Sequence, residues 1–574
     1  MARRDPALLR SHRWFGRDDL RGFAHRQRMQ QIGFAREQFL GKPVIGILNA
    51  WSGLSPCHAH LRARAETAAQ GVLAAGGFPV ELPVLSLGEV MVKPTTMLYR
   101  NLLAMETEEL IRSHPLDAVL LLGGCDKTGP GLVMGAISAD CPCIFVPAGP
   151  MTNAKWRGET VGAGTHTRRF WDEYRAGRLS DAEWVALEAS MTRGIGTCNT
   201  MGTASTMTLA IEALGLSLPG AAAIPAADAE HVRMVTRSAQ HIVEMAWEDL
   251  RPSRILSAAS FLNAAVAVLA CGGSTNAPIH LIAMARRAQL PLALNDFERL
   301  AARIPVLVDL MPAGSHLMQD FFHAGGLPAL LAQLGDAIDG SCATVTGTQL
   351  SAGLSGAKIL DDEVIRPRAR PVLERPAFVV LHGNLAPDGA LLKPTAAEPR
   401  LLQHRGTALV FDGPADLARR IDAPELPVTP ESVIVLRGGG PIGGPGMPEW
   451  GNLPIPKKLL AQGVRDMLRV SDARMSGTHY GACVLHCAPE AAVGGPLALV
   501  RDGDEIELDY ARRTLTLHVA DDELARRRAA WKAPASYAQR GYAVLYARHV
   551  TQAPEGCDFD FLDGRDGVPE PEIY

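Results

Sequence analysis

The sequence predicts an α/β fold, with an N-terminal doubly wound parallel-sheet domain followed by a smaller, β-rich domain. Apolar runs alternate with helical segments in the first part of the chain, and short β-type runs with Gly, Pro and Asp turns dominate the last part. A chain of 574 residues also exceeds what one hydrophobic core normally holds. We therefore expect domains at residues 1–370 and 377–574, joined by a linker from Arg366 to Pro376.

Four runs are predicted as strands, and the first and third are expected to be buried, because strands of a covered parallel sheet are apolar throughout. They are Pro43 to Ala50, Phe78 to Leu85, Ala118 to Leu122 and Cys143 to Ala148. Helical patterns separate the first three strands, and later helices are expected at about 228 to 249 and 258 to 289. The strands expected in the second domain are Phe378 to Leu381, Ala408 to Phe411, Ser432 to Leu436, Glu505 to Leu508 and Thr514 to Val519.

Composition excludes several classes of protein. The chain is 47% hydrophobic and 21% charged with a net charge of −4, so nothing favours nucleic acid or an anionic membrane as a partner. No signal peptide or membrane-spanning segment is expected. Ten cysteines in so long a chain are too sparse for a disulfide scaffold, which predicts reduced thiols and a cytoplasmic protein.

Polar residues follow three predicted strands at the point where each strand ends. Cys57 follows the first strand, Glu89 the second, and Cys125, Asp126 and Lys127 the third. Parallel strands end at one edge of the sheet, where open α/β sheets bind ligands, so we expect these side chains to converge. Taken singly, each cysteine also fits a small buried hydrophobe and each carboxylate a solvated loop.

A third cysteine, Cys198, stands before a glycine- and threonine-rich helix start, whose N-terminus favours a thiolate or an anion. The wide spacing of Cys57, Cys125 and Cys198 is not that of a zinc ribbon, and three thiolates could leave a metal with an open position. Glu89, Asp126 and Glu449 are oxygen donors of the type that Mg²⁺ takes.

Ser476 lies between Met475 and Gly477 after a polar turn, outside any hydrolase elbow. Near a metal pair it could act as a base, although most Ser-Gly pairs are only turns. The nearby histidines are expected to be hydrogen-bonding neighbours, and His166 and His479 are candidates to face a substrate.

Four motifs occur in the order in which one enzyme family carries them. They are Gly-Gly-Cys125-Asp-Lys-Thr-x-Pro, Thr-Cys198-x-Thr-Met-Gly-Thr-Ala-Ser-Thr, Gly-Gly-Pro-Gly-Met-Pro-Glu449 and Ser-Asp-x-Arg-x-Ser476-Gly. On these motifs the chain resembles the dihydroxy-acid and sugar-acid dehydratase family from about residue 30 to 550. Arg13-Trp-Phe and the overall length are most similar to the branch of L-arabinonate and D-xylonate dehydratases.

The resemblance implies a barrel-like C-terminal domain, a homodimer or homotetramer, and two cofactors. It implies a [2Fe–2S] cluster, with [4Fe–4S] as the alternative, on Cys57, Cys125 and Cys198. It also implies Mg²⁺ bound by Glu89, Asp126, Glu449 and a carbamylated Lys127, with Ser476 as the base and Thr478 as a substrate contact.

Three functions stay open at this point. The first is a hydro-lyase that converts a sugar acid to its 2-keto-3-deoxy acid, and the second is the dihydroxy-acid dehydratase of branched-chain amino-acid synthesis. The third is an iron–sulfur redox protein without turnover. His479 stands where a smaller residue is expected in the sugar-acid branch, so the preferred substrate is also open.

Overall fold

The N-terminal part of the protein is built on a four-stranded, wholly parallel sheet with the strand order β2-β1-β3-β4. Its strands are β1 (Val44–Asn49), β2 (Phe78–Pro83), β3 (Ala118–Gly123) and β4 (Cys143–Pro147). The computed structural model describes residues 4–564 and 568–573. Every residue of β1, β3 and β4 is buried, so the predicted strands and the doubly wound class are confirmed.

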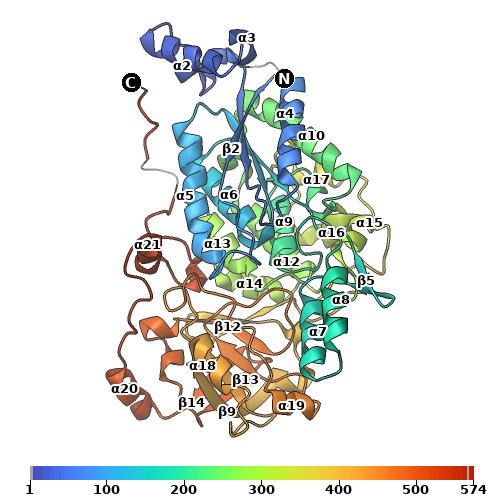
Figure 1. Ribbon diagram of the computed structural model, residues 1–574, viewed down its shortest axis with the longest axis vertical. Coiled ribbons are helices and arrows are strands. Elements are labelled where there is room, and N and C mark those ends of the chain that lie inside the picture. Colours follow the sequence, from blue (N-terminus) through green and yellow to red (C-terminus); the bar gives the residue numbers. More distant parts are fainter. Residues whose placement is uncertain (1–3, 565–567, 574) are drawn as a thin grey trace.

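Helices cover both faces of this sheet (Figure 1). The chain runs from β1 to β2 in one direction and from β3 to β4 in the other, so right-handed crossovers place α4 (Leu61–Ala74) and α6 (Cys125–Ala139) on opposite faces. Glycine permits the close approach of α6 to α5 (Met97–Ser113), since a Cβ on Gly135 would lie 2.4 Å from the Ala104 carbonyl oxygen. On the other face α4 packs against α10 (Ala229–Glu248), with Gly71 against Ala239.

The remaining elements of this part surround the sheet and its helices. They are α1 (His12–Phe15), α2 (Leu20–Gln31), α3 (Arg36–Phe39), β5 (Ala154–Trp156), β6 (Glu159–Val161), α7 (Thr165–Arg175), α8 (Asp181–Met191), α9 (Thr203–Ala213), α11 (Pro252–Ile255), α14 (Leu294–Ala301), α15 (Met318–His323), α16 (Gly326–Leu334) and α17 (Leu350–Gly353). None of the helices in the described part of the chain has the length and apolarity needed to cross a bilayer.

The prediction of one helix from 258 to 289 is wrong. The structure has two helices, α12 (Ala258–Ala270) and α13 (Ala277–Arg287), separated by a turn. Gly272 adopts φ +71° in that turn, and Pro278 lies in the first turn of α13, where its missing N–H is tolerated. The signal was present in the sequence, because Gly272, Gly273 and the polar residues Ser274 to Asn276 interrupt the apolar pattern between the two buried helices.

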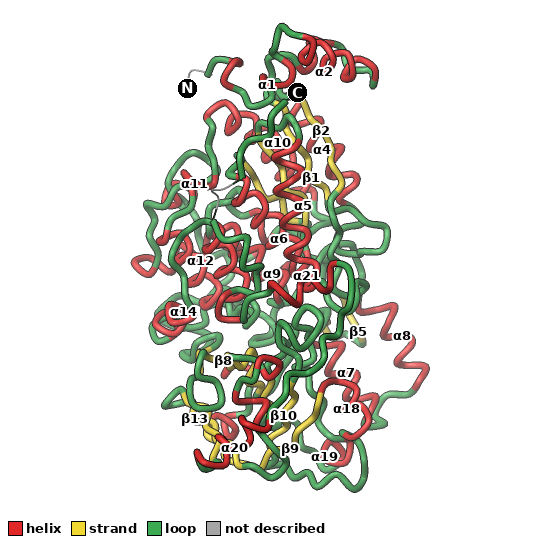
Figure 2. The backbone as a smooth tube through the Cα atoms, turned by 90° about the vertical axis from the view of Figure 1, so that its left-hand side faces the viewer, coloured by secondary structure: helices red, strands yellow, loops and turns green. Residues whose placement is uncertain are grey.

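The C-terminal part is an eight-stranded mixed sheet with the order β14-β13-β9-β10-β11-β12-β8-β7. A bridge between His382, next to β7, and Thr514 of β14 joins the two edges, so the sheet closes into a barrel. Figure 2 shows it below the parallel sheet. Its elements are β7 (Val379–Leu381), β8 (Gly389–Leu392), β9 (Gln403–Asp412), α18 (Gly413–Arg420), β10 (Val433–Arg437), α19 (Lys457–Ala461), β11 (Arg469–Ser471), β12 (Cys483–Ala488), β13 (Glu505–Asp509), β14 (Thr514–His518) and α20 (Asp521–Ala530). All five predicted strands and the barrel-like form are confirmed.

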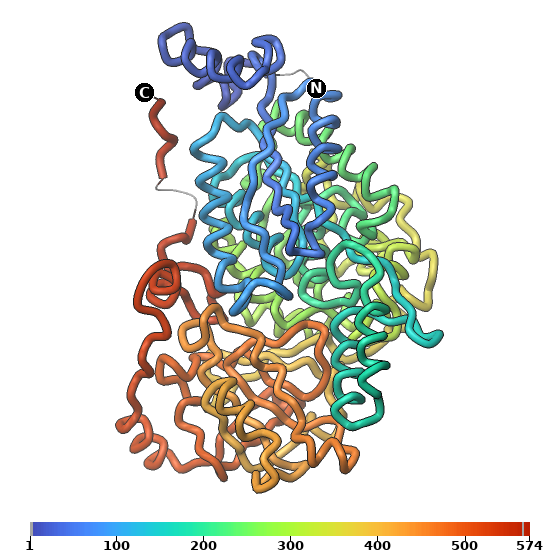
Figure 3. The backbone as a smooth tube through the Cα atoms, in the orientation of Figure 1, coloured from blue at the N-terminus to red at the C-terminus, as the bar shows by residue number. Residues whose placement is uncertain are grey.

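After the barrel, the chain returns to the N-terminal part (Figure 3). Helix α21 (Tyr542–His549) packs beside Met97 and Leu98 at the start of α5. The buried guanidinium of Arg287 then forms a paired contact with Asp558, with Nε 2.7 Å from Oδ2 and Nη2 2.9 Å from Oδ1. This ion pair fastens the returning segment to α13.

Replacing Arg287 by Met should lower the free energy of unfolding by about 3–5 kcal/mol, because Asp558 would stay buried without its partner. The control is Arg286→Met, since Arg286 is partly exposed and pairs with Asp563 at the surface, where such pairs contribute about 1 kcal/mol or less. Urea unfolding of both variants measures the difference. Equal losses would show that the Arg287–Asp558 pair has no special role.

Candidate active site

The chain leaves β1 toward β2 and leaves β3 toward β4, in opposite directions along the sheet, so the strand order reverses between β1 and β3. The loops that follow these two adjacent strands therefore diverge and leave a crevice between them. Cys57 lies in the loop after β1, and Cys125 is the first residue of α6, directly after β3. Glu89 lies in the loop after β2. Doubly wound sheets bind ligands at this reversal, so the predicted cysteine and carboxylate positions occupy the crevice that the topology creates.

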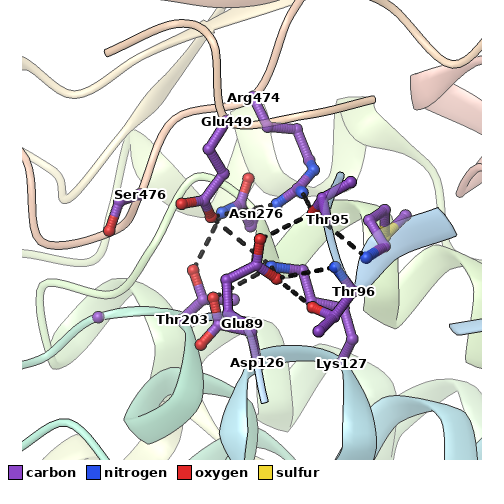
Figure 4. Close-up of polar contacts among 12 residues, drawn as sticks. Glu89, Thr95, Thr96, Asp126, Lys127, Thr203, Asn276, Glu449, Arg474 and Ser476 are labelled. Atoms are coloured by element: carbon purple, nitrogen blue, oxygen red, sulfur yellow. Dashed lines mark hydrogen bonds and ion pairs between the residues drawn. The ribbon is translucent and has the colours of Figure 1, made fainter. Parts of the chain in front are cut away.

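Three carboxylates surround the ammonium group of Lys127 (Figure 4). Lys127 Nζ lies 3.0 Å from Glu89 Oε2, 3.1 Å from Asp126 Oδ2 and 3.6 Å from Glu449 Oε1. Burial and the nearby Arg474 lower the pKa of Lys127, but the carboxylates outweigh them and the pKa is raised. Lys127 is therefore charged, and it joins the sheet domain to the barrel domain, which supplies Glu449.

The carboxylates point at Lys127 Nζ and not at a common vacant point. Accordingly, no group of three or more His, Cys, Asp or Glu side chains within residues 4–564 and 568–573 is arranged to hold a metal ion. The oxygen donors are of the kind that Mg²⁺ takes, but an ammonium at their centre would repel a cation. The donor set fits Mg²⁺ only once Lys127 no longer presents its positive charge there.

Glu89 and Glu449 differ in their electrostatic environment. Burial raises the pKa of Glu89, but Lys127 and Arg474 lower it further, and the net value is about 2. Thr95 Oγ1 donates to Glu89 Oε1 at 2.7 Å, and the Thr96 hydroxyl donates to Oε2. For Glu449 burial dominates, and the pKa is raised. Glu89 is therefore the carboxylate most firmly held in its ionised form.

Arg474 connects three loops at this centre. Its fully buried guanidinium donates from Nε to the Met447 carbonyl at 2.8 Å, from Nη1 to Glu449 Oε1 at 3.3 Å and from Nη2 to Thr95 Oγ1 at 3.1 Å. The sequence analysis did not single out Arg474, although it is the arginine of the Ser-Asp-x-Arg-x-Ser motif. Its place in that motif, two residues before Ser476, was the sequence feature that could have identified it.

Two buried carboxylates fix the glycine-rich loop that carries Glu449. Asp472 accepts the N–H groups of two consecutive glycines at the start of the loop, at 3.2 and 2.9 Å. Glu490 accepts the N–H groups of Ile442 and Gly443, each at 2.8 Å. Because a Cβ on Gly440 would lie 2.5 Å from Glu490, glycine is required for this close approach. The loop is therefore rigid.

The three predicted cluster cysteines lie close together. The thiol of Cys57 is hydrogen-bonded to Cys125, and this bond, burial and the nearby Cys198 raise the pKa of Cys57 well above its usual value. Burial also raises the pKa of Cys198 to about 12. All ten cysteines lie in the described part of the chain and are unpaired. Three neighbouring thiols are donors of the type that a thiophilic metal takes once they are ionised, but within the described residues they are not arranged as a ligand set.

His58 fixes the loops that carry Cys57 and Cys125. Its Nδ1 lies 2.7 Å from Ser86 Oγ, and its Nε2 lies 2.9 Å from the Gly124 carbonyl oxygen. Burial lowers the pKa of His58 to about 4, so the ring is neutral. It is a hydrogen-bonding neighbour of the thiols, as the sequence predicted.

Ser476 and Thr478 lie in a loop packed against the N-terminus of α9. Their hydroxyl oxygens are 2.9 Å apart, and the N–H of Thr478 is directed at Ser476 Oγ at 3.4 Å. A Cβ on the intervening Gly477 would lie 2.9 Å from the backbone nitrogen of Thr203, the first residue of α9. The positive end of the helix dipole and these donors favour a negative charge on Ser476.

The unexpected turn between α12 and α13 supports this loop. Asn276 Nδ2 donates to the Met475 carbonyl and to Thr203 Oγ1, each at 3.0 Å, and Ser274 Oγ lies 2.9 Å from Thr203 Oγ1. Figure 4 shows Asn276 between Ser476 and the Lys127 cluster. The sequence analysis missed Asn276 because it placed the residue inside a helix.

The two histidines proposed to face a substrate have different environments. His166 is buried, its Nδ1 accepts the Gly162 N–H at 3.0 Å, and its Nε2 lies 3.4 Å from Glu159. These contacts are structural. Both ring nitrogens of His479 are enclosed and have no hydrogen-bond partner, and the ring stacks on Tyr480 with centroids 5.4 Å apart.

Fold and site together define a two-domain α/β enzyme whose polar centre lies between a doubly wound sheet and a barrel. Family models for the N-terminal and C-terminal regions of dihydroxy-acid/6-phosphogluconate dehydratases match residues 42–353 and 363–557. The chain belongs to this dehydratase family, which confirms the resemblance seen in its motifs.

Similar proteins cover nearly the whole chain. It is 59% identical to a 6-deoxy-6-sulfo-D-gluconate dehydratase of Pseudomonas putida, over 99% of this chain and 98% of the relative. It is 50% identical to an L-arabonate dehydratase of Azospirillum brasilense, over 98% of each chain. It is 37% identical to a dihydroxy-acid dehydratase of Moorella thermoacetica, over 93% of this chain and 97% of the relative.

The support of the glycine-rich loop by Glu490 should make stability depend on pH. Burial raises the pKa of Glu490 from 4.5 to about 7, so the folded state binds this proton more tightly than the unfolded state. The resulting stabilisation is complete below about pH 4.5 and is lost as the pH rises through about 7, by up to about 3 kcal/mol. Glu490→Gln should flatten this part of the profile, measured by urea unfolding between these limits. Exposed Glu431→Gln is the control, and an unchanged slope in Glu490→Gln would contradict the assignment.

Proposed function

We propose that the protein is a hydro-lyase that dehydrates a sugar acid to the 2-keto-3-deoxy acid. The substrate class is an aldonate, such as L-arabinonate, D-xylonate or a related 2,3-dihydroxy carboxylate. Relatives named for sugar acids are 59% and 50% identical to this chain, whereas the dihydroxy-acid dehydratase is 37% identical. This difference favours the sugar-acid reaction over that of branched-chain amino-acid synthesis.

The proposal includes two cofactors. Cys57, Cys125 and Cys198 would hold a [2Fe–2S] cluster, with [4Fe–4S] as the alternative, and three protein thiolates would leave one iron position open. Glu89, Asp126 and Glu449 would hold Mg²⁺ together with Lys127 as a carbamate, which removes the ammonium charge and adds oxygen donors. When bound, the two centres supply a hard and a softer Lewis acid that polarise substrate oxygens.

The chain's own residues would supply the proton transfer. Ser476, ionised through its position at the α9 N-terminus, would take the proton from C2 of the substrate. The hydroxyl of Thr478, 2.9 Å from Ser476 Oγ, would stabilise the alkoxide and then contact the substrate. As the C3–O bond breaks, the leaving hydroxyl takes up the proton that Ser476 removed from C2 and departs as water, which restores the Ser476 alkoxide, and the resulting enol tautomerises to the 2-keto acid.

One observation supports this function above the others: carboxylates from both domains meet at Lys127 beside three neighbouring thiols. A redox protein without turnover would need neither the carboxylates nor Ser476. The test is anaerobic reconstitution with iron, sulfide and Mg²⁺, followed by a panel of L-arabinonate, D-xylonate, D-gluconate and 2,3-dihydroxyisovalerate. Turnover of the last compound alone would favour the amino-acid pathway, and turnover of none would favour the redox protein.

We also propose that the protein acts in the cytoplasm as a homodimer or homotetramer. The ten unpaired cysteines support a reducing compartment. Helix α2 projects from the rest of the molecule in Figure 1 and exposes Leu20 (78%) and Phe23 (59%), followed by Ile32 (68%). Apolar side chains gathered on a projecting helix fit a contact with a second copy of the chain.

The variant Ser476→Ala should keep the cluster spectrum and lose turnover by at least about 100-fold, because a general base contributes roughly that factor or more. Visible absorbance and product formation are measured on the same anaerobic sample. Ser471→Ala serves as the matched serine control. Near-normal turnover in Ser476→Ala would exclude Ser476 as the base.

The variant Lys127→Arg should lose Mg²⁺ binding, since arginine retains its charge and forms no carbamate under these conditions. Calorimetric titration should show that the wild type binds Mg²⁺ more tightly with bicarbonate present. The exposed Lys155→Arg variant is expected to behave as the wild type. If Lys127→Arg binds Mg²⁺ normally, or if bicarbonate has no effect on the wild type, Lys127 is not a carbamylated ligand.

A further inference from the structure

Arg168 on α7 lies beside the proposed base but takes no part in the chemistry described so far. Helix α7 starts against the base loop, because Thr165 Oγ1 donates to the Thr478 carbonyl at 2.8 Å. A Cβ on Gly164 would lie 2.4 Å from Thr478 Oγ1, so this approach is very close. Arg168 is one helical turn beyond Thr165 and therefore lies on the same side of α7.

Arg168 also contacts the loop that follows Glu449. With the amide of Asn452 oriented so that its oxygen faces the guanidinium, Oδ1 accepts from Arg168 Nη1 at 3.2 Å and from Nη2 at 2.8 Å. Asn452 is three residues beyond Glu449. The guanidinium is thus placed between the Ser476–Thr478 loop and the glycine-rich loop, on the border of the proposed active site.

The other basic side chains at this border contact carboxylates. Lys127 and Arg474 contact Glu449, and Arg469 pairs with Asp466 at 2.7 Å. Arg168 forms no ion pair with any residue in the described ranges, and its Nε is enclosed without a hydrogen-bond partner. Burial lowers its pKa overall, although Glu449, Tyr480 and Asp172 act in the opposite direction without forming an ion pair with it. An enclosed guanidinium of this kind is stabilised by an anion that enters the site.

His479 offers a second free polar group at the same place. Both of its ring nitrogens are enclosed without partners, and burial followed by Arg168 and Arg469 holds its pKa well below the usual range. The ring is therefore neutral and presents one N–H donor. Unpartnered donors from Arg168 Nε and the His479 ring suit an anion with several oxygens.

We infer that the sugar acid carries a second anionic group, a sulfonate or phosphate at the end remote from its carboxylate, and that Arg168 binds it. This inference rests on the proposed function, in which the carboxylate end lies at the Lys127 cluster. A substrate whose carboxylate lies at the Lys127 cluster extends past Ser476. The end of the substrate remote from the carboxylate then lies near Thr478, His479 and Arg168. The P. putida relative is named for such a compound, a gluconate whose C6 carries a sulfonate.

The inference is tested by kcat/KM for 6-deoxy-6-sulfo-D-gluconate, 6-phospho-D-gluconate, D-gluconate and L-arabinonate. The wild type should prefer at least one of the first two over D-gluconate by about 10-fold or more, and the better one identifies the group. Arg168→Gln should lower kcat/KM for that compound by about 10–100-fold, mainly through KM, since a charge-assisted hydrogen bond contributes roughly this factor. The decrease in kcat/KM that Arg168→Gln causes with D-gluconate should be clearly smaller. Arg168→Lys should recover part of the preference for the sulfonated or phosphorylated compound over D-gluconate.

The matched control is Arg169→Gln, because Arg169 is partly exposed, pairs with Glu159 at the surface and changes the net charge equally. It should keep the wild-type preference. If Arg168→Gln lowers turnover of all four compounds equally, Arg168 has only a structural role and the inference fails. If D-gluconate or L-arabinonate is the preferred substrate of the wild type, the inference fails while the proposed function stands. If no sugar acid is dehydrated, both fail.

Discussion

The contact between the Lys127 ammonium and three carboxylates determines how the two domains meet. Asp126 and Lys127 belong to the start of α6, Glu89 to the loop after β2, and Glu449 to the barrel domain. Buried charges of one sign repel strongly at low dielectric, so these carboxylates stay together only around a cation. A cation at that centre holds Glu449 beside Glu89 and Asp126, so the proposed active site depends on the contact between the two parts of the chain.

Rigid surroundings hold this centre in place. Arg474 connects the Glu449 loop to Thr95, Asp472 and Glu490 fix the glycine-rich loop, and His58 ties the Cys57 loop to Gly124. Each contact uses a buried polar group whose loss would leave a partner unsatisfied. These buried polar groups around the Lys127 centre therefore hold the loops that carry its ligating side chains in the orientation that ligand binding requires.

Local patterns in the sequence predicted the parts of the protein that follow from periodicity and strand ends. The four parallel strands, five of the eight barrel strands and the positions of Cys57, Glu89 and Asp126 after the ends of parallel strands could be foreseen. The turn at residues 271–276 was missed, although the polar, glycine-rich run from Gly272 to Asn276 interrupts the apolar pattern and Pro278 follows it. Asn276 reaches the base loop only through that turn, and Arg168 and Arg474 reach the site through contacts between distant segments.

The two ends of the site differ in charge, and this difference gives the substrate an orientation. At the Lys127 cluster carboxylates are in excess, so that end suits a cation and, through it, the carboxylate of a sugar acid. At the other end, Arg168 forms no ion pair with any described residue and lies near enough to the neutral His479 ring to lower its pKa, so that end suits an anion. Ser476 lies in the loop between them. A substrate with negative groups at both ends would place one at the Lys127 cluster and the other at Arg168. A substrate with a neutral far end would leave Arg168 without a counter-ion.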